Sequence, residues 1–352
     1  MDKIPLKSII VLTAGVIITM LLISRANQKK SESGKLAQIQ ETKETELSGW
    51  LAYWKETPGL EVIKKYGGSF TNISPFWFFL DKDYNLKLNG QLNKNEIIDE
   101  LKVQGISVYI TLSSEIKNDE IGSFLDNKQA VNEFNNLVVA ELKKYGADGL
   151  DLDFEDIPAD YKDSFSSYVL NLSGRLKEEK LKLSVTLHSK TGKNDYKGSE
   201  GQDVKYISGI ADEIRIMAYD KHGTFSEPGA ITPYDWLKDV IEYNKKLVPS
   251  DKLVIGIPTY GYIWKLENEK VSEVNGYQYE DFSKNISLMG TAEYQVKRDL
   301  GSGEMVYKGT GFEGWLSDHV SVKQKMDFLK GMGINRFILW QIGGMDVSFF
   351  NY

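Results

Sequence analysis

The sequence predicts an α/β fold in which eight parallel strands close into a (β/α)8 barrel with helices outside. Three observations favour this fold: eight short apolar or aromatic runs follow residue 49, amphipathic segments separate them, and several runs end in aromatic residues. Strands that alternate with helices pair in parallel. An open doubly wound sheet is the alternative, and eight units with aromatic strand ends favour closure.

The N-terminal segment is predicted to be separate from the barrel. Ser8 to Ile23 is an uncharged, mostly apolar run of 16 residues between basic flanks. We expect residues 1–25 to form a membrane signal-anchor, or a signal peptide if it is cleaved. No small-x-small site follows the run, which favours the uncleaved anchor. More positive charges follow the run than precede it, and by the positive-inside rule this would leave the C-terminal part in the cytoplasm.

A polar linker is expected next, at residues 26–47, because this stretch has mixed charge and no sustained apolar period. The remaining residues, 48–352, are assigned to the barrel. The length suits a barrel of roughly 250 residues with additions. With 41% hydrophobic residues the chain can bury a sizeable core.

The eight runs have the length and composition of buried strands, rich in β-branched and aromatic residues. In chain order they are Trp50–Trp54, Phe70–Leu80, Ile106–Leu112, Gly149–Phe154, Leu181–Leu187, Glu213–Tyr219, Leu253–Pro258 and Arg336–Gln341. Their number is that of a TIM barrel.

The segments between the runs show helical periodicity and helix-end residues. Two of them place apolar residues on one helix face, at Val131, Phe134, Val138 and Leu142, and at Phe165, Val169, Leu172 and Leu176. A third helix is expected to begin at Thr232-Pro233, with a capping hydroxyl and then proline at the first helical position. The last is expected from Ser321 to Leu329, ending at Gly331.

One connection is too long for a single helix, because about 75 residues separate the seventh and eighth runs. Residues 264–318 are predicted to form a small α+β insertion. It would leave from the C-terminal end of a strand and would wall one side of the active face.

Composition excludes several classes of function. The chain has no Cys and only three His, so disulfides, thiolate metal sites and a cysteine nucleophile are excluded, and a His-built metal site is disfavoured. The net charge of −7 makes nucleic acid a poor default partner. We expect no cofactor and no metal, and a monomeric chain.

The stretch Asp148–Asp156, which reads DGLDLDFED, carries the most informative carboxylates. Side chains alternate along a strand, so Asp151, Asp153 and Glu155 share one face while leucine and phenylalanine occupy the other. In a barrel the apolar face meets the helices and the acids point inward. Three inward acids cannot all ionise cheaply, so we expect a shared proton and a protonated Glu155 near neutral pH.

Two other interpretations of this acid row are a solvated surface and a metal-binding loop. A solvated surface face is disfavoured, because the intervening residues are large and apolar. A calcium loop shares the D-x-D-x-E spacing, but it needs Gly at its sixth position, where Asp156 stands. A magnesium or other divalent site stays open at this point.

Four motifs in chain order resemble glycoside hydrolase family 18, the chitinase family. Asp148–Asp156 matches its D-G-x-D-x-D-x-E signature, Ile216–Asp220 (IMAYD) resembles its sixth-strand M-x-Y-D, and Ile255–Gly261 (IGIPTYG) its seventh-strand G-I-P-x-Y-G. Trp340 stands where the family has its eighth-strand tryptophan. The stretches MAYDKHG and WLSD resemble a bacterial subgroup of spore-cortex-lytic, germination-type N-acetylglucosaminidases. The third-strand S-x-G-G of many chitinases is replaced by Thr111–Ser114.

The resemblance implies a role for each catalytic residue. Glu155 would protonate the glycosidic oxygen while the 2-acetamido oxygen of the sugar attacks the anomeric carbon, the exception to two-carboxylate hydrolysis. Asp153 would orient the acetamide and stabilise the oxazolinium, and Asp151 would hold Asp153 and share its proton. Tyr219 would donate its hydroxyl to the acetamido oxygen.

Substrate-binding residues are expected around this row. Trp340 would give the sugar ring a flat apolar floor, and Met217 stands in the same motif as Tyr219. Asp220 is either an orienting acid or a turn former. Tyr53 and Tyr260, together with other aromatic residues near strand ends, would line a glycan cleft or serve only in packing; those others are Trp54, Trp77, Tyr262 and Trp264.

The expected function is a retaining glycosidase that cuts β-1,4 links at N-acetylglucosamine, with peptidoglycan as the favoured substrate. A membrane-tethered enzyme meets cell-wall glycan on the outer side, so we expect an extracytoplasmic catalytic domain, or a secreted one if the N-terminus is cleaved. Chitin or chito-oligosaccharide hydrolysis is the near alternative. A non-catalytic, lectin-like barrel is the alternative from another class, and it is disfavoured because such family members typically lack the terminal Glu that Glu155 supplies.

Overall fold

The computed structural model describes residues 45–193, 195–289 and 293–351 and divides the chain into two units, Met1–Glu44 and Thr45–Tyr352. The predicted anchor and most of the predicted linker lie outside the described residues. Within the described ranges, no helix has the length and apolar character needed to cross a membrane. The second unit begins with the barrel, whose first strand starts at Glu46, so the last two residues assigned to the linker belong to that strand.

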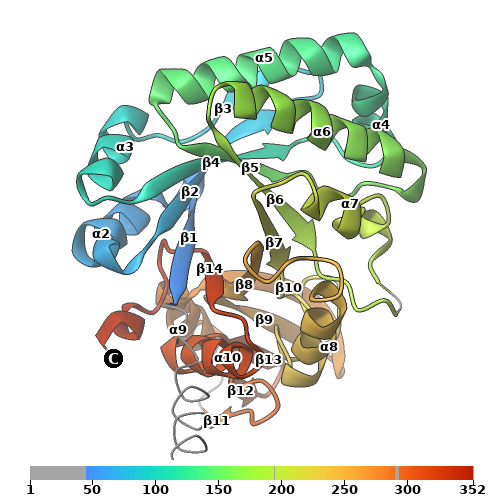
Figure 1. The fold of residues 1–352 in the computed structure, drawn as a ribbon. Helices are drawn as coiled ribbons and strands as arrows, with labels where there is room; N and C mark the ends of the chain where they lie inside the picture. Colours follow the sequence, from blue (N-terminus) through green and yellow to red (C-terminus); the bar gives the residue numbers. More distant parts are fainter. Residues whose placement is uncertain (1–44, 194, 290–292, 352) are drawn as a thin grey trace, which may run out of the picture. The chain divides into compact units, whose positions relative to one another are not determined.

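Eight parallel strands form a closed barrel, as predicted (Figure 1). The strands are β1 Glu46–Ala52, β2 Asn72–Leu80, β4 Ser107–Ser114, β5 Gly149–Asp153, β6 Lys182–His188, β7 Glu213–Met217, β8 Leu253–Pro258 and β14 Arg336–Trp340. They are ordered β1-β14-β8-β7-β6-β5-β4-β2, and β2 pairs back with β1 to close the barrel. Each of the eight predicted runs overlaps one of these strands, and the largest difference is at β1, which begins four residues before the predicted Trp50. The short β3, Leu86–Leu88, pairs antiparallel with β2 and was not predicted.

Helices cover the outside of the barrel (Figure 1). They are α2 Glu56–Tyr66, α3 Lys94–Val103, α4 Asp119–Asp126, α5 Lys128–Tyr145, α6 Lys162–Glu178, α7 Val204–Ser208, α8 Tyr234–Asn244 and α10 His319–Gly331. The apolar positions predicted for the helix faces of α5 and α6 are all buried in the core between helices and strands. The periodicity therefore identified the inward faces of these two helices correctly.

Two helix starts differ from the prediction. The hydroxyl of Thr232 does not cap α8; it donates to the carbonyl oxygen of Ala218 at 3.1 Å, and Pro233 occupies the N-cap position without a side-chain bond. The last helix, α10, begins before Ser321, because the side chain of Asp318 accepts a hydrogen bond from the backbone N–H of Ser321. Its end at Gly331 is confirmed.

The long connection between β8 and β14 holds a separate five-stranded sheet, in the order β10-β9-β13-β12-β11. Its elements are β9 Tyr260–Glu267, β10 Lys270–Gln278, α9 Tyr279–Ser287, β11 Tyr294–Arg298, β12 Met305–Gly309 and β13 Phe312–Leu316. Phe282 and Ile286 of α9 pack on one face of this sheet. The insertion therefore begins at Tyr260, four residues before the predicted boundary, because β9 follows β8 with only Thr259 between them.

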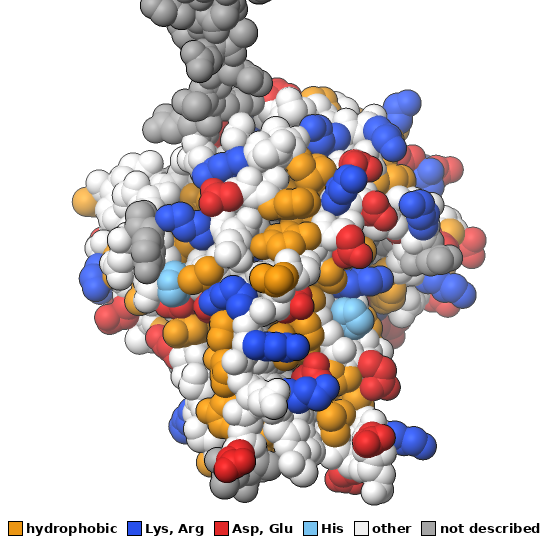
Figure 2. Space-filling view, turned by 90° about the horizontal axis from the view of Figure 1, so that it is seen from below, with side chains coloured by type: hydrophobic (Ala, Val, Ile, Leu, Met, Phe, Trp, Pro, Cys, Tyr) orange, Lys and Arg blue, Asp and Glu red, His pale blue; other side chains and the backbone are white. Residues whose placement is uncertain are grey.

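Charges of both signs are mixed on the face of the molecule seen from below in Figure 1. Figure 2 shows a band of hydrophobic side chains in the middle of this face, with Lys, Arg, Asp and Glu interspersed around it. A phosphate-binding face would instead gather one sign of charge. This face therefore lacks the electrostatic pattern of a nucleic-acid surface.

Candidate active site

Strand β5 places the acid row inside the barrel. Asp151 is fully buried and Asp153 is 4% exposed. Glu155 follows the end of the strand, where its side chain is 40% exposed. The alternate residues, Leu150 and Leu152, lie in the core between barrel and helices. The predicted alternation of acids inward and apolar residues outward is thus present.

The residues before the acids fix the backbone of β5. The carboxylate of Asp148 accepts a hydrogen bond from the backbone N–H of Val108 on the neighbouring β4, at 2.8 Å. A side chain at Gly149 would begin 2.6 Å from the carbonyl oxygen of Lys182 on β6, so only glycine fits there. Asp148 therefore holds the backbone of β4 beside β5 and does not belong to the acid row.

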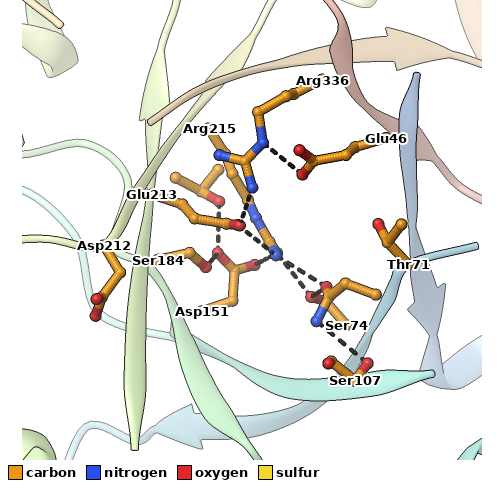
Figure 3. A network of polar contacts seen from close by, with 12 residues as sticks. Glu46, Thr71, Ser74, Ser107, Asp151, Ser184, Asp212, Glu213, Arg215 and Arg336 are labelled. Carbon is orange, nitrogen blue, oxygen red and sulfur yellow. Dashed lines mark hydrogen bonds and ion pairs between the residues drawn. The ribbon is translucent and has the colours of Figure 1, made fainter. Parts of the chain in front are cut away.

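Donors surround the buried carboxylate of Asp151 (Figure 3). Its Oδ1 accepts from Ser184 Oγ at 2.7 Å and Thr186 Oγ1 at 2.9 Å, and its Oδ2 accepts from Trp50 Nε1 at 2.8 Å and Thr111 Oγ1 at 3.0 Å, with Nη1 of Arg215 at 3.2 Å. These five donors come from β1, β4, β6 and β7. Burial of a carboxylate is offset when donors replace its water shell in this way.

Asp153 lies in a different setting from Asp151. Its Oδ1 is buried and has no hydrogen-bond partner among the described residues. Burial raises the pKa of Asp153 well above its usual range, the charges of Glu155 and Asp151 raise it further, and Arg215 partly offsets them. The structure does not join Asp151 and Asp153 by a hydrogen bond, because the oxygens of Asp151 are taken by the five other donors.

Glu155 is the acid at the open end of the row. Burial raises its pKa, the charge of Asp156 adds to this, and Lys117 counteracts it. Nε2 of His188, at the end of β6, lies 3.7 Å from Oε2 of Glu155 and has no hydrogen-bond partner among the described residues. Burial lowers the pKa of His188 to about 4, so its ring is neutral near pH 7.

Asp156 joins the loops on both sides of Glu155. Its carboxylate pairs with Lys117 at 2.8 Å and accepts from the hydroxyl of Tyr196 at 2.5 Å. Its carbonyl oxygen accepts from the backbone N–H of Asn118 at 3.1 Å. Burial would raise the pKa of Asp156, but Lys117 and Tyr196 bring it below its ordinary value, so it stays ionised. The loops after β4 and β6 are thereby tied to the residue that follows Glu155.

Tyr219 lies two residues beyond β7, buried at 8% exposure. Burial raises its pKa well above the usual value, with Asp153 as the next cause, so the phenol keeps its proton and can donate it in a hydrogen bond. A side chain at Gly256 on β8 would lie 2.9 Å from Cε1 of this ring. The glycine of the G-I-P segment therefore makes room for Tyr219.

Asp220 and Tyr260, both predicted to bind substrate, contact one another. The hydroxyl of Tyr260 donates to Oδ1 of Asp220, and the hydroxyl of Tyr262 donates to the same oxygen at 3.1 Å. Burial raises the pKa of Asp220 to about 6, while the two hydroxyls counteract part of this rise. The hydroxyl of Tyr260 is thus bonded to Asp220. Strand β9 of the insertion thereby holds this acid, which lies three residues beyond the end of β7.

The loop that follows Asp220 is anchored by a buried ion pair. Glu304, in the turn before β12, accepts from the backbone N–H groups of Ile231 and Thr232 at 2.8 and 2.9 Å. Nζ of Lys325 on α10 lies 3.0 Å from Oε1 of Glu304, and both side chains are fully buried. The insertion and α10 therefore support the loop as well as the wall of the site.

Aromatic residues gather at the ends of β1, β2 and β14. Trp340 packs edge-on against Trp54 and Phe76, with ring centroids 6.2 and 5.5 Å apart. Trp54 is 52% exposed, which makes it the most open tryptophan among the described residues at these strand ends. The half-exposed indole of Trp54 beside Trp340 leaves an apolar ring surface open at these strand ends.

The other predicted substrate-binding and aromatic positions divide into two groups. Tyr53 follows β1 and packs edge-on against Trp54 and Phe79, and Met217 is half-buried against the same aromatic cluster. Two other tryptophans are fully buried and bonded inside the protein, Trp77 to the carboxylate of Glu56 and Trp264 to the carbonyl oxygen of Ser226. These last two are packing residues.

A divalent cation finds no ready site in the part of the chain that the structure describes, where no group of three or more His, Asp and Glu is arranged to hold a metal ion. Asp151 is occupied by donors, and the neighbour of Glu155 on β6 is the neutral His188. These are hydrogen-bonding surroundings, and a hard cation would need several oxygen ligands at about 2–2.6 Å.

Sequence reasoning missed Arg215 and His188. Arg215 stands in an apolar run, Glu213–Tyr219, on the face that points into the barrel. A basic residue on the inner face of a strand indicates an acidic partner inside the barrel, and this pattern could have been read from the sequence. His188 ends its strand run, and nothing in the sequence distinguishes it from a packing histidine.

Comparisons with known proteins identify the family of the chain. The family model for glycosyl hydrolases family 18 matches residues 53–346. The uncharacterized glycosylase YvbX of Bacillus subtilis is 25% identical over 312 residues, which cover 84% of this chain and 87% of that protein. A cortical fragment-lytic enzyme of Bacillus anthracis is 25% identical over 284 residues, covering 78% of this chain and 65% of that protein.

Solved structures show the same fold. The spore cortex-lytic enzyme SleL of Bacillus megaterium matches with a TM-score of 0.75 at 22% identity, over 88% of this chain and 73% of that one. A chitinase of Chromobacterium violaceum matches with a TM-score of 0.75 at 22% identity, over 87% of this chain and 97% of that one. With the acid row on β5, the tyrosine beyond β7 and a match that spans most of the barrel, the chain belongs to glycoside hydrolase family 18.

Proposed function

We propose that the chain is a retaining glycosidase that cuts β-1,4 links at N-acetylglucosamine, with the 2-acetamido group of the substrate as nucleophile. The observation that carries this proposal is the graded burial of the acid row. Asp151 and Asp153 are enclosed, and Glu155 alone of the three reaches solvent. A single accessible acid with a raised pKa suits proton donation, and the nucleophile must then come from elsewhere.

The proposed first step uses Glu155, Asp153 and Tyr219. The carboxyl of Glu155 gives its proton to the glycosidic oxygen as the bond from that oxygen to the anomeric carbon breaks. The acetamido oxygen forms a bond to the same carbon from the opposite face, which yields an oxazolinium ion. Asp153 faces the positive charge of this ion, and the protonated phenol of Tyr219 aligns the acetamido oxygen.

The second step returns the protein to its starting state. Water attacks the anomeric carbon, the bond to the acetamido oxygen breaks, and the carboxylate of Glu155 takes the proton that water releases. Two displacements at one carbon retain its configuration. His188, neutral and 3.7 Å from Glu155, leaves the proton on Glu155 rather than competing for it.

Peptidoglycan is the proposed substrate. The relatives named above include a cortical fragment-lytic enzyme and a spore cortex-lytic enzyme, and these names support a cell-wall glycan. The chitinases among the solved structures support chitin as the second candidate. Both polymers present N-acetylglucosamine, so the row of acids alone does not select between them.

The test compares the wild type with Glu155→Gln and Asp153→Asn on muramic-lactam cortex, vegetative cell wall and chitin. We expect each variant to lower turnover by at least about 10²-fold, the scale of a lost general acid. Mass analysis of new reducing ends identifies the cleaved bond. The control is Glu133→Gln on the outer surface of α5, which should keep full activity. Binding without cleavage by the wild type would instead favour a lectin-like barrel.

We also propose that residues 1–25 tether the catalytic domain to the outer side of the cell membrane. The support is the uncharged apolar run at Ser8 to Ile23 and the polar stretch that follows it. Protease added to intact protoplasts that carry the full-length chain should digest the barrel. A barrel that is digested only after lysis would place it in the cytoplasm, as the positive charges after the run predict.

A further inference from the structure

Arg215 is a fully buried arginine inside the barrel, on β7, which β6 separates from the acid row on β5 (Figure 3). Its Nη1 lies 3.2 Å from Oδ2 of Asp151 and donates to Oγ of Ser74 at 2.6 Å. Its Nη2 donates to Oδ1 of Asn72 at 2.9 Å and lies 3.3 Å from Oε2 of Glu213. A guanidinium stays protonated under all ordinary conditions, so the barrel encloses a permanent positive charge.

The charge of Arg215 is directed mainly at Asp151. Glu213, the other carboxylate beside it, is paired with Nη2 of Arg336 at 2.5 Å. Arg336 also pairs with Glu46 at 2.7 Å, so this second arginine shares its single charge between Glu213 and Glu46 (Figure 3). Asp151 has no cation other than Arg215 within salt-bridge distance among the described residues.

Two aromatic rings complete the surroundings of the guanidinium. Its Cζ lies 5.9 Å from the ring centroid of Trp50 and 5.7 Å from that of Tyr109. A cation near aromatic faces is stabilised by the ring quadrupoles. Trp50 also donates its indole N–H to Asp151 at 2.8 Å. The ring thus touches both members of the ion pair.

The hydrogen-bond donors around Asp151 disfavour a proton on its carboxylate. Its Oδ2 faces Trp50, Arg215 and the hydroxyl of Thr111, and of these the indole and guanidinium groups can only donate. A proton on Oδ2 would find an acceptor only if the hydroxyl of Thr111 stopped donating to that oxygen. On Oδ1, a proton would require the hydroxyls of Ser184 and Thr186 to rotate away from a charge-assisted bond. All five neighbours donate to the carboxylate, and two of them, Trp50 and Arg215, have no way to accept a proton from it.

We propose that Arg215 is a positioning residue that keeps Asp151 ionised, so that the mobile proton of the acid row belongs to Asp153 and Glu155 alone. This inference rests on the proposed function, because it concerns the same three acids. It replaces the proton shared between Asp151 and Asp153 that the sequence led us to expect. The fixed negative charge of Asp151 also favours a protonated Asp153 in the resting protein.

The test measures how many protons the folded protein binds, and it needs no substrate. Capillary electrophoresis gives the net charge of wild type and Arg215→Met between pH 6 and 8. If Arg215 keeps Asp151 ionised, its loss lets Asp151 take up a proton, and the net charge near pH 6 stays equal to that of wild type. Arg175→Met is the matched control, since its guanidinium donates to the side chains of Asn171, Asn136 and Asn132. It should lose one positive charge at every pH.

Further variants identify the site of the proton. Arg215→Met/Asp151→Asn should match the wild-type charge, since both members of the pair are gone. A charge one unit more positive would mean that Glu213 takes the proton. Arg215→Lys should keep the wild-type charge throughout. Arg215→Met that loses one full charge, as the Arg175 control does, would overturn the proposal.

Folding gives a second measurement. Removing one partner of a buried pair leaves the other charge uncompensated, so Arg215→Met should be destabilised in urea, and adding Asp151→Asn should recover most of the loss. If Asp151→Asn recovers none of it, Arg215 acts through Asn72, Ser74 and Glu213 instead, and the proposal fails. An inactive wild type with these charge changes intact would defeat the proposed function and leave this inference standing.

Discussion

Replacing Gly256 by Ala would test the placement of Tyr219. The new methyl group would lie 2.9 Å from Cε1 of Tyr219 and 3.0 Å from the carbonyl oxygen of Ile216. Ile216 is held in the sheet opposite Ile255, so the ring has to give way. Carbon atoms make good contact at about 3.5 Å, and the ring must therefore retreat by about half an ångström.

The displacement of the Tyr219 ring should lower kcat. A displacement of about 1 Å at a positioning group can cost about 10²-fold, so half of that predicts a fall in kcat of about tenfold on an N-acetylglucosamine oligomer. Overpacking should also lower the free energy of unfolding by about 1–3 kcal/mol. Steady-state kinetics and urea denaturation measure the two effects separately.

A double-mutant comparison isolates the role of the tyrosine. In a Tyr219→Phe background, which lacks the hydroxyl, Gly256→Ala should lower kcat much less than in the wild type. The control is Gly174→Ala on α6, where a side chain meets nothing within 4 Å. It should raise stability by about 1 kcal/mol without changing kcat. Equal losses of rate in both backgrounds would refute the idea that Gly256 exists to seat Tyr219.

Three other changes have outcomes that follow from the structure. Burial raises the pKa of Asp220 to about 6 in the folded state, so its protonated form stabilises the protein below about pH 4, and this contribution is lost as pH rises to 6. In Asp220→Asn the free energy of unfolding should not show this loss, which urea denaturation at several pH values would measure. Lys325→Met leaves Glu304 buried without its cation and should cost about 3–5 kcal/mol; if the double variant with Glu304→Gln is no more stable than Lys325→Met, the pair is not the cause. Trp54→Ala should raise KM about tenfold with kcat unchanged, as expected for lost sugar stacking that is equal in ground and transition states; a fall in kcat alone would contradict this.

The barrel could be predicted because the patterns that indicate it are local in the sequence. Strand runs, helix faces and the alternation along β5 all depend on spacing within ten or twenty residues. The two expected helix starts, at Thr232 and Ser321, were wrong because a hydroxyl can cap a helix or bond elsewhere, and only the fold decides which partner it has. The partner of Thr232 is the carbonyl oxygen of Ala218.

The surroundings of the acids depend on residues far apart in the sequence. Trp50 and Asp151 are 101 positions apart, and Arg215 meets Ser74 across 141 positions. No local pattern reports such a pairing. Tyr260 illustrates the same limit, since its motif suggested a substrate contact and the fold gives its hydroxyl to Asp220.

The immediate passage from β8 into β9 has a consequence for protein engineering. One residue separates the two strands, and the tyrosines that hold Asp220 stand in the first three positions of β9. A chimera that exchanges the whole inserted module with that of a relative would therefore change the side chains that bond to Asp220. Grafts should be joined beyond Trp264, so that the native pair of phenols remains with the host enzyme.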